Sequence, residues 1–109
     1  MLSTPGLTVF VAAHGTEVVG TATLFVMPNL GYDCHPTGFI EAVVVAEQHR
    51  RRGVGSRLID AVLAEARRLS VRKVQLLSHK RHASDGAFTF YERCGLDAEA
   101  EGFRLYLRS

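Results

Sequence analysis

The spacing of apolar side chains along the chain follows two periods, and each period predicts its own kind of element. Four short apolar stretches bounded by turn residues predict β-strands over residues 7–12, 18–27, 38–45 and 71–78. Between the third and the fourth, apolar residues recur at helical spacing and predict an amphipathic helix. Its expected core positions are Leu58, Ile59, Val62, Leu63, Ala66 and Leu69. A second helix is expected over residues 83–93 and a final strand or hairpin over residues 96–107.

The order of these elements predicts an α/β (α+β) fold with a mixed sheet. The first two strands flank the turn-forming residues 14–17 and predict an antiparallel N-terminal hairpin. A strand, a helix and a strand follow, which predicts a central parallel strand pair joined by a right-handed crossover helix. The run Val43, Val44 and Val45 is expected of a strand that is covered on both faces. The length and the lack of repeats or linkers predict a single domain over residues 1–109.

Charge is distributed unevenly between the two halves of the chain. Residues 1–49 carry four acidic residues and no Lys or Arg, whereas residues 50–109 carry 13 Lys and Arg against seven acidic residues. A polyanionic ligand therefore belongs with the second half. The chain lacks the apolar run of a membrane span and the basic start of a signal peptide, and its two cysteines are expected to be free thiols, so a cytoplasmic location is expected. No His or Cys spacing predicts a metal site.

The turn between the third strand and the first helix has the composition of an anion-binding site. Gly53 and Gly55 fall where a strand gives way to a helix N-terminus, whose first N–H groups have no partner within the helix. Glycines there let phosphate oxygens approach the backbone, and Arg50, Arg51 and Arg52 add positive charge. The turn therefore predicts a diphosphate site.

Two other phosphate motifs do not fit this turn. A Walker loop needs Gly-Lys followed by Ser or Thr, and no such triplet occurs. The dinucleotide fingerprint fails because Leu58 stands where its third glycine is required. Nucleic-acid binding by the Arg run stays an alternative, although few aromatic residues accompany the Arg clusters.

The turn matches the signature R-x-x-G-x-G through Arg50, Gly53 and Gly55, and here the chain resembles the GCN5-related N-acetyltransferase (GNAT) superfamily. A second motif of that family, A-x-x-F-Y-E-x-x-G-F, is matched by residues 87–96 with one Leu in place of Phe. Many members have Pro at the place of Glu47 and Gly at that of Arg51. The resemblance implies a GNAT-like mixed sheet and an N-acetyltransferase that transfers acetyl from acetyl-CoA to a primary amine of a small molecule by direct attack.

The resemblance also implies which residues bind acetyl-CoA. Backbone groups at the end of the central strand would pair with the pantetheine arm, and the turn would hold the pyrophosphate. Ser84 stands where many members have Asn, and Lys80 or Arg81 would meet an outer phosphate. The expected cofactor-binding residues are Val43, Val44, Val45, Arg50, Arg51, Arg52, Gly53, Val54, Gly55, Ser56 and Ser84.

Two residues are candidates for proton transfer. Tyr91 matches the tyrosine that acts as an acid toward the leaving thiolate in many relatives, and a packing aromatic is the alternative for it. Glu41 is the candidate base, because a lone carboxylate in an apolar strand is unusual and its burial would raise its pKa. Strand alternation places Glu41 on the face of Val43 and Val45, and a structural ion pair with an Arg is its alternative role. His35, His79 and His82 are reserve bases.

The family usually begins with a strand and one or two helices before the hairpin, whereas only residues 1–6 precede it here, so a short member is expected. Three interpretations stay open: an N-acetyltransferase, a catalytically idle CoA-binding or regulatory module, and a basic nucleic-acid-associated protein. Asp33, Glu41 and Glu47 are consistent with a cationic amine as acceptor but do not identify it. The final strand is expected to pair with a second copy and form a homodimer.

Overall fold

The computed structural model describes residues 6–28, 35–82 and 84–107 of the chain. These residues divide into two compact units, with the boundary between residues 76 and 77. Within the described ranges, no helix is long and apolar enough to cross a membrane. Most of the loop expected between the second and third strands, residues 29–34 with Asp33 and Cys34, lies outside the described residues.

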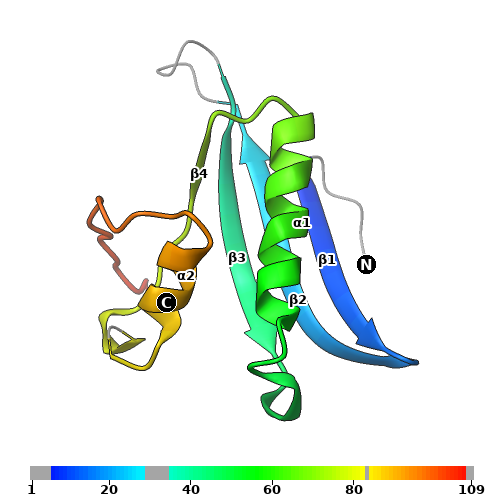
Figure 1. The fold of residues 1–109 in the computed structure, drawn as a ribbon. Helices are drawn as coiled ribbons and strands as arrows, with labels where there is room; N and C mark the ends of the chain where they lie inside the picture. The colour runs from blue at the N-terminus through cyan, green and yellow to red at the C-terminus, as the bar shows by residue number, and fades with distance from the viewer. Residues whose placement is uncertain (1–5, 29–34, 83, 108–109) are drawn as a thin grey trace. The chain divides into compact units, whose positions relative to one another are not determined.

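The first unit is a four-stranded sheet with a helix across one face (Figure 1). Strands β1, β2 and β3 pair antiparallel in chain order, and β4 pairs parallel to β3 after the crossover helix α1. The predicted mixed sheet, N-terminal hairpin and parallel pair are therefore confirmed. The bounds are β1 (Leu7–His14), β2 (Glu17–Met27), β3 (Thr37–Val45), α1 (Val54–Arg68) and β4 (Lys73–Gln75).

The core of this unit lies between α1 and the sheet. Four of the predicted helical positions are buried, namely Leu58, Ile59, Val62 and Ala66, and on the sheet side Val19, Ala22, Leu24 and Ile40 are buried. Gly20 allows the close approach of helix and sheet, because a Cβ at Gly20 would lie 3.0 Å from side-chain atoms of both Val54 and Leu58. The first helical residues of α1 are thereby held against β2.

Strand β3 contains a β-bulge that the sequence does not reveal. Thr21 pairs with Val44 and Thr23 with Glu41, so two residues of β3 stand opposite Ala22 alone. One of the two, Ala42, has a φ of 52°, which is unusual for a residue with a Cβ. The Thr21 hydroxyl donates a hydrogen bond to the Ala42 carbonyl oxygen over 3.2 Å. The bulge is thus supported from the neighbouring strand.

Strand β4 is shorter than the strand predicted over residues 71–78. It pairs with β3 only from Thr37 to Phe39, whereas β3 continues to Val45. Within the described part of the chain, the last six residues of β3 have no strand partner on this side. Strand pairing therefore leaves the backbone groups of this part of the edge to other partners, and the Val45 carbonyl oxygen accepts from Arg50 Nε.

The second unit contains the 3₁₀-helix η2 (Lys80–His82) and the helix α2 (Ala87–Arg93). The helix predicted from residue 83 begins later, because Gly86 has a left-handed backbone with φ 98° and ends the turn before it. Gly95, with φ 100°, and Leu96 close α2 by donating to the carbonyls of Glu92 and Tyr91, which is a Schellman motif. The prediction of a final strand or hairpin over residues 96–107 was wrong, since no regular structure follows α2 in the described residues.

Candidate functional site

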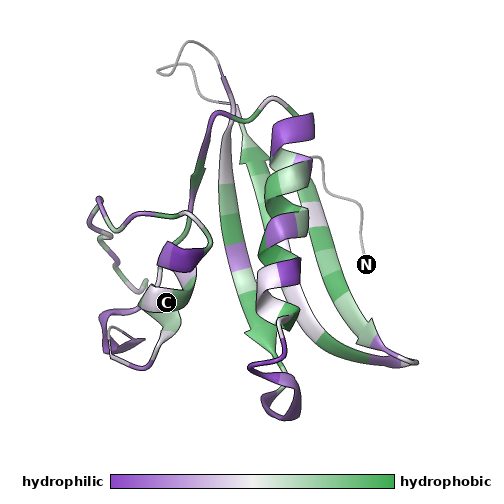
Figure 2. Cartoon of the chain, viewed as in Figure 1, coloured by the Kyte–Doolittle hydropathy of each residue, from purple (hydrophilic) through white to green (hydrophobic). Residues whose placement is uncertain are grey.

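The connection between β3 and α1 has the geometry that the anion-binding prediction requires. A 3₁₀ turn η1 (Glu47–His49) leads into it, and Gly53 stands at the N-cap of α1 with a left-handed φ of 81°. Arg51 is also left-handed, with φ 64°. Figure 2 shows this connection as a hydrophilic stretch below the end of α1. The two left-handed residues turn the chain directly into the helix.

The N-terminus of α1 is suited to an anion. Among the described residues no side chain caps it, and its first turn contains no acidic residue, so the leading N–H groups of Val54, Gly55 and Ser56 lack a described side-chain acceptor. A Cβ at Gly53 would meet nothing within 4 Å, so the space above this glycine is open. The N–H donors, the positive end of the helix dipole and the open space above Gly53 together suit the binding of a diphosphate.

The three arginines of the turn differ in their contacts. Arg50 Nε donates to the Val45 carbonyl oxygen over 3.0 Å, which joins the turn to the last residue of β3. Arg51 and Arg52 are exposed and make no described hydrogen bond or ion pair. Their charges therefore face solvent beside the helix N-terminus.

The end of β3 differs from the sequence prediction in two respects. The valine run is not covered on both faces, because the Val44 side chain is 57% exposed. Glu41 is exposed, so the expected burial of this carboxylate was wrong. The bulge also shifts the alternation by one residue: Val45 pairs with Gly20 on the α1 face, while Glu41 pairs with Thr23 on the opposite face.

Sequence reasoning missed Thr21, whose hydroxyl supports the bulge next to the expected pantetheine-binding residues. A lone Thr in a strand carries no signal of such a role, since threonine is common in strands. Only the register of β2 against β3 reveals it.

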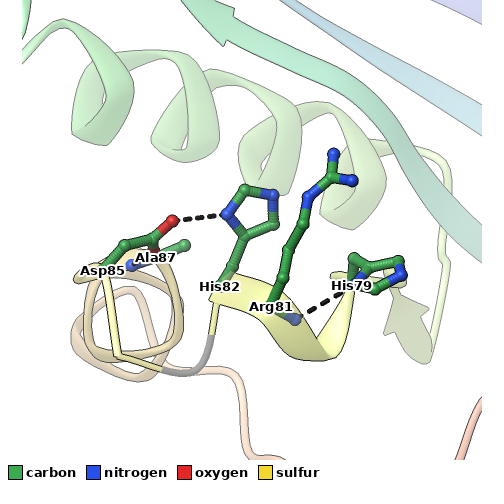
Figure 3. Close-up of polar contacts among 5 residues, drawn as sticks. All are labelled: His79, Arg81, His82, Asp85 and Ala87. Atoms are coloured by element: carbon green, nitrogen blue, oxygen red, sulfur yellow. Dashed lines mark hydrogen bonds and ion pairs between the residues drawn. The ribbon is translucent and has the colours of Figure 1, made fainter.

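In the second unit, a short network orders the segment before α2 (Figure 3). His82 Nδ1 lies 2.5 Å from Asp85 Oδ2, and Asp85 Oδ1 accepts from the Ala87 N–H over 3.0 Å. The hydrogen bond from His82, followed by that from Ala87, holds the pKa of Asp85 below its ordinary value. His79 Nδ1 accepts a hydrogen bond from the Arg81 N–H over 3.0 Å. Two of the reserve bases, His79 and His82, are thus held by hydrogen bonds within this unit.

Tyr91 and Ser84 also belong to the second unit. Tyr91 is half-buried in α2, and burial raises its pKa above the ordinary value, with a smaller contribution from Cys94. Its hydroxyl therefore stays protonated at neutral pH. Ser84, Lys80 and Arg81 are exposed, as cofactor contacts would have to be. In the described ranges, no three His, Cys, Asp or Glu residues form a metal-binding group.

Comparison with known proteins identifies relatives over most of the chain. The model of the acetyltransferase (GNAT) family matches residues 1–96. The glucosamine 6-phosphate N-acetyltransferase of Schizosaccharomyces pombe is 35% identical over 90 residues, which are 83% of this chain and 77% of that protein. The enzyme of the same name from Trypanosoma brucei brucei is 33% identical over 91 residues, 84% of this chain but 58% of that protein.

A solved structure is similar over nearly the whole chain. The putative acetyltransferase from Agrobacterium tumefaciens str. C58 superimposes with a TM-score of 0.89 and 36% sequence identity, over 95% of this chain and 71% of that one. The sheet and crossover helix described above are therefore shared with that protein.

Proposed function

Because the chain belongs to the acetyltransferase (GNAT) family, we propose that it transfers an acetyl group from acetyl-CoA to a primary amine of a small molecule. The observation that carries this proposal is the family match over residues 1–96, which includes both the R-x-x-G-x-G turn and the helix of Tyr91. The match also runs through the boundary between the two units, and this supports a single acetyltransferase domain over residues 1–109.

The first unit would bind most of the cofactor. The uncapped N–H groups of Val54, Gly55 and Ser56, with Gly53 and the charges of Arg51 and Arg52, fit its diphosphate. The open edge of Val43–Val45 fits the amide-bearing pantetheine arm, which can pair with it like an added strand. Ser84 in the second unit is the proposed additional contact.

Proton transfer would need one acid and one base. When bound, acetyl-CoA supplies a thioester whose carbonyl carbon accepts the amine and whose sulfur leaves. Tyr91 is the proposed acid toward that sulfur, because it stands at the place of the family's tyrosine in the second motif and its phenol is protonated at neutral pH. Glu41 is the proposed base that takes the proton of the amine; with burial excluded, this role rests on its place directly before the bulge.

The proposed acceptor class is an amino sugar phosphate. Two relatives at 33% and 35% identity are named glucosamine 6-phosphate N-acetyltransferases, which supports an amine on a sugar ring that carries a phosphate. The excess of Lys and Arg after residue 49 agrees with an acceptor and a cofactor that both carry phosphate.

Calorimetry with acetyl-CoA, dephospho-CoA and ATP tests the cofactor. We expect saturable binding of acetyl-CoA, weaker binding of dephospho-CoA and none of ATP. Acetylation of glucosamine 6-phosphate, glucosamine and a lysine peptide is then compared in the presence of acetyl-CoA. Preference for the sugar phosphate supports the acceptor class, and preference for the peptide contradicts it.

Tyr91→Phe separates an enzyme from an idle module. Loss of an acid is expected to reduce turnover by about 10²-fold or more, with the Kd of acetyl-CoA unchanged. A parent protein that binds acetyl-CoA but acetylates none of the amines would support the idle CoA-binding module. Failure of acetyl-CoA to bind would exclude the enzyme for this chain.

A homodimer is proposed through the C-terminal segment 103–107. Phe103, Leu105 and Leu107 are 93%, 81% and 89% exposed. Arg104 donates to the Tyr106 hydroxyl over 3.2 Å, so these two side chains lie on one side of the segment. The three apolar side chains alternate with them, which supports an apolar strip that a second copy would cover.

A further inference from the structure

The connection from β3 to α1 is held by few bonds of its own. Ala46 N–H donates to the Val19 carbonyl over 2.8 Å, and His49 N–H to the Ala46 carbonyl over 2.8 Å. Arg50 N–H reaches the Glu47 carbonyl only at 3.3 Å. Within the described chain, no backbone hydrogen bond of this kind involves residue 51 or 52, and the next is the first helical bond, from Arg57 to Gly53. The backbone alone therefore leaves the start of the turn weakly fixed.

The backbone conformation of the turn requires additional contacts that stabilise it. Arg51 adopts a left-handed φ of 64°, which is unfavourable for a residue with a Cβ. A turn with such an unfavourable backbone angle persists only where contacts with the surrounding residues stabilise it; otherwise other conformations of the turn compete. The side chain of Arg50, immediately before Arg51, supplies a bond to the end of β3 through Nε and the Val45 carbonyl.

We infer that Arg50 is a positioning residue that fixes the anion-binding turn to the end of β3, while Arg51 and Arg52 supply charge to the diphosphate. The inference rests on the proposed function, since it concerns binding of acetyl-CoA. It gives the first residue of the R-x-x-G-x-G signature a role different from direct charge: its Nε is already engaged with the backbone at 3.0 Å.

Four variants distinguish position from charge. In Arg50→Gln, the amide nitrogen lies the same number of bonds from Cα as Nε does in arginine, so it can donate to the Val45 carbonyl without the charge. Arg50→Met removes both the hydrogen-bond donor and the positive charge. Arg52→Gln and Arg52→Met are the matched pair at an exposed arginine without a described contact.

The Kd of acetyl-CoA is measured by calorimetry for all four. Arg52→Gln and Arg52→Met are expected to weaken binding equally, since both remove one charge. Arg50→Met is expected to bind about fivefold more weakly than Arg50→Gln, the factor that corresponds to one hydrogen bond of about 1 kcal/mol. Equal binding by Arg50→Gln and Arg50→Met would overturn the inference, whether or not both are weaker than the parent.

Hydrogen exchange without the cofactor gives a second readout. The amides of Ala46, His49 and Arg50 are expected to exchange about fivefold faster in Arg50→Met than in Arg50→Gln, with no difference between the Arg52 variants. If the parent does not bind acetyl-CoA, the proposed function fails, yet the exchange rates still decide whether Arg50 fixes the turn. Equal rates in the two Arg50 variants would overturn the inference.

Discussion

Ala42 adopts a backbone conformation that is rare for a residue with a Cβ, and it does so at the bulge of β3. Its φ of 52° costs roughly 1–2 kcal/mol, against about 0.5–1 kcal/mol that glycine loses through its greater freedom in the unfolded chain. Ala42→Gly is therefore expected to increase the free energy of unfolding by about 0.5–1 kcal/mol, measured by urea denaturation.

The control for this variant is Ala61→Gly in the exposed interior of α1, where the backbone is helical. There the same exchange should destabilise the protein by about 1 kcal/mol. Destabilisation of similar size at both positions would contradict the assignment of strain to Ala42.

The raised pKa of Tyr91 predicts that the stability of the protein changes at alkaline pH. Its pKa in the folded state is raised, first by burial and then by Cys94, relative to the ordinary value of 10.0. The unfolded chain therefore loses this proton at lower pH than the folded chain does, so the Tyr91 contribution is present below pH 10 and is lost as pH rises through the folded pKa.

Urea denaturation of the parent and of Tyr91→Phe between pH 8 and pH 11 tests this sign. The parent is expected to lose more stability over this range than the variant, because phenylalanine has no proton to lose. Tyr106→Phe, at a tyrosine that is 72% exposed, is the control and should behave like the parent. Parallel curves for the parent and for Tyr91→Phe would contradict the expectation.

Helix α1 shows how much of an element the apolar pattern determines. Its period of 3.6 predicts six core positions, of which Leu58, Ile59, Val62 and Ala66 are buried and Leu63 is half-buried. Leu69, the last position of the pattern, lies at the C-cap and is exposed, because the helix ends at Arg68. The spacing of apolar residues thus predicts the buried face of the helix well but does not predict where the helix ends.

The elements that the pattern misplaces depend on long-range pairing or on a single backbone angle. Residues 103, 105 and 107 alternate as a strand should, yet a strand forms only with a partner, and none is present in the described chain. The bulge in β3 follows from the register against β2, which no local run of residues encodes. The wrong prediction that Glu41 is buried has the same origin, because the face of the sheet on which Glu41 lies depends on that register.

Ile59 is the position on α1 where a smaller side chain should cost most. It is fully buried, with an exposure of 0%, in the core between the helix and the sheet. Ile59→Ala is expected to reduce the free energy of unfolding by about 2–5 kcal/mol, the loss of buried surface plus the cavity left behind. Urea denaturation measures it, with Ala64→Gly as a control on the exposed face, for which about 1 kcal/mol is expected. A loss at Ile59 no larger than at Ala64 would contradict this core assignment.

At the level of the whole chain, the family match and the anion-binding turn could be anticipated from two short motifs, because glycines and a preceding apolar strand are local features. Four cofactor-binding predictions from the turn fall on the N-cap and first turn of α1, namely those for Gly53, Val54, Gly55 and Ser56. Their role toward acetyl-CoA stays a prediction. The acceptor could not be derived, since its pocket depends on how distant side chains meet.

The proposed homodimer predicts that one side of the segment 103–107 matters and the other does not. Leu105→Gln places a polar group on the strip of Phe103, Leu105 and Leu107, whereas Tyr106→Gln changes the opposite side. Each buried leucine contributes about 1.5–3 kcal/mol, and a symmetric dimer buries two, so Leu105→Gln should weaken the dimer about 100-fold or more.

Sedimentation velocity over a wide range of concentrations measures this dimer equilibrium. Tyr106→Gln is expected to associate like the parent, since its side chain does not belong to the strip. A parent that stays monomeric at every concentration would contradict the dimer. Equal weakening by Leu105→Gln and Tyr106→Gln would show instead that the segment does not pair through one face, because a strand buried on one side distinguishes alternate residues.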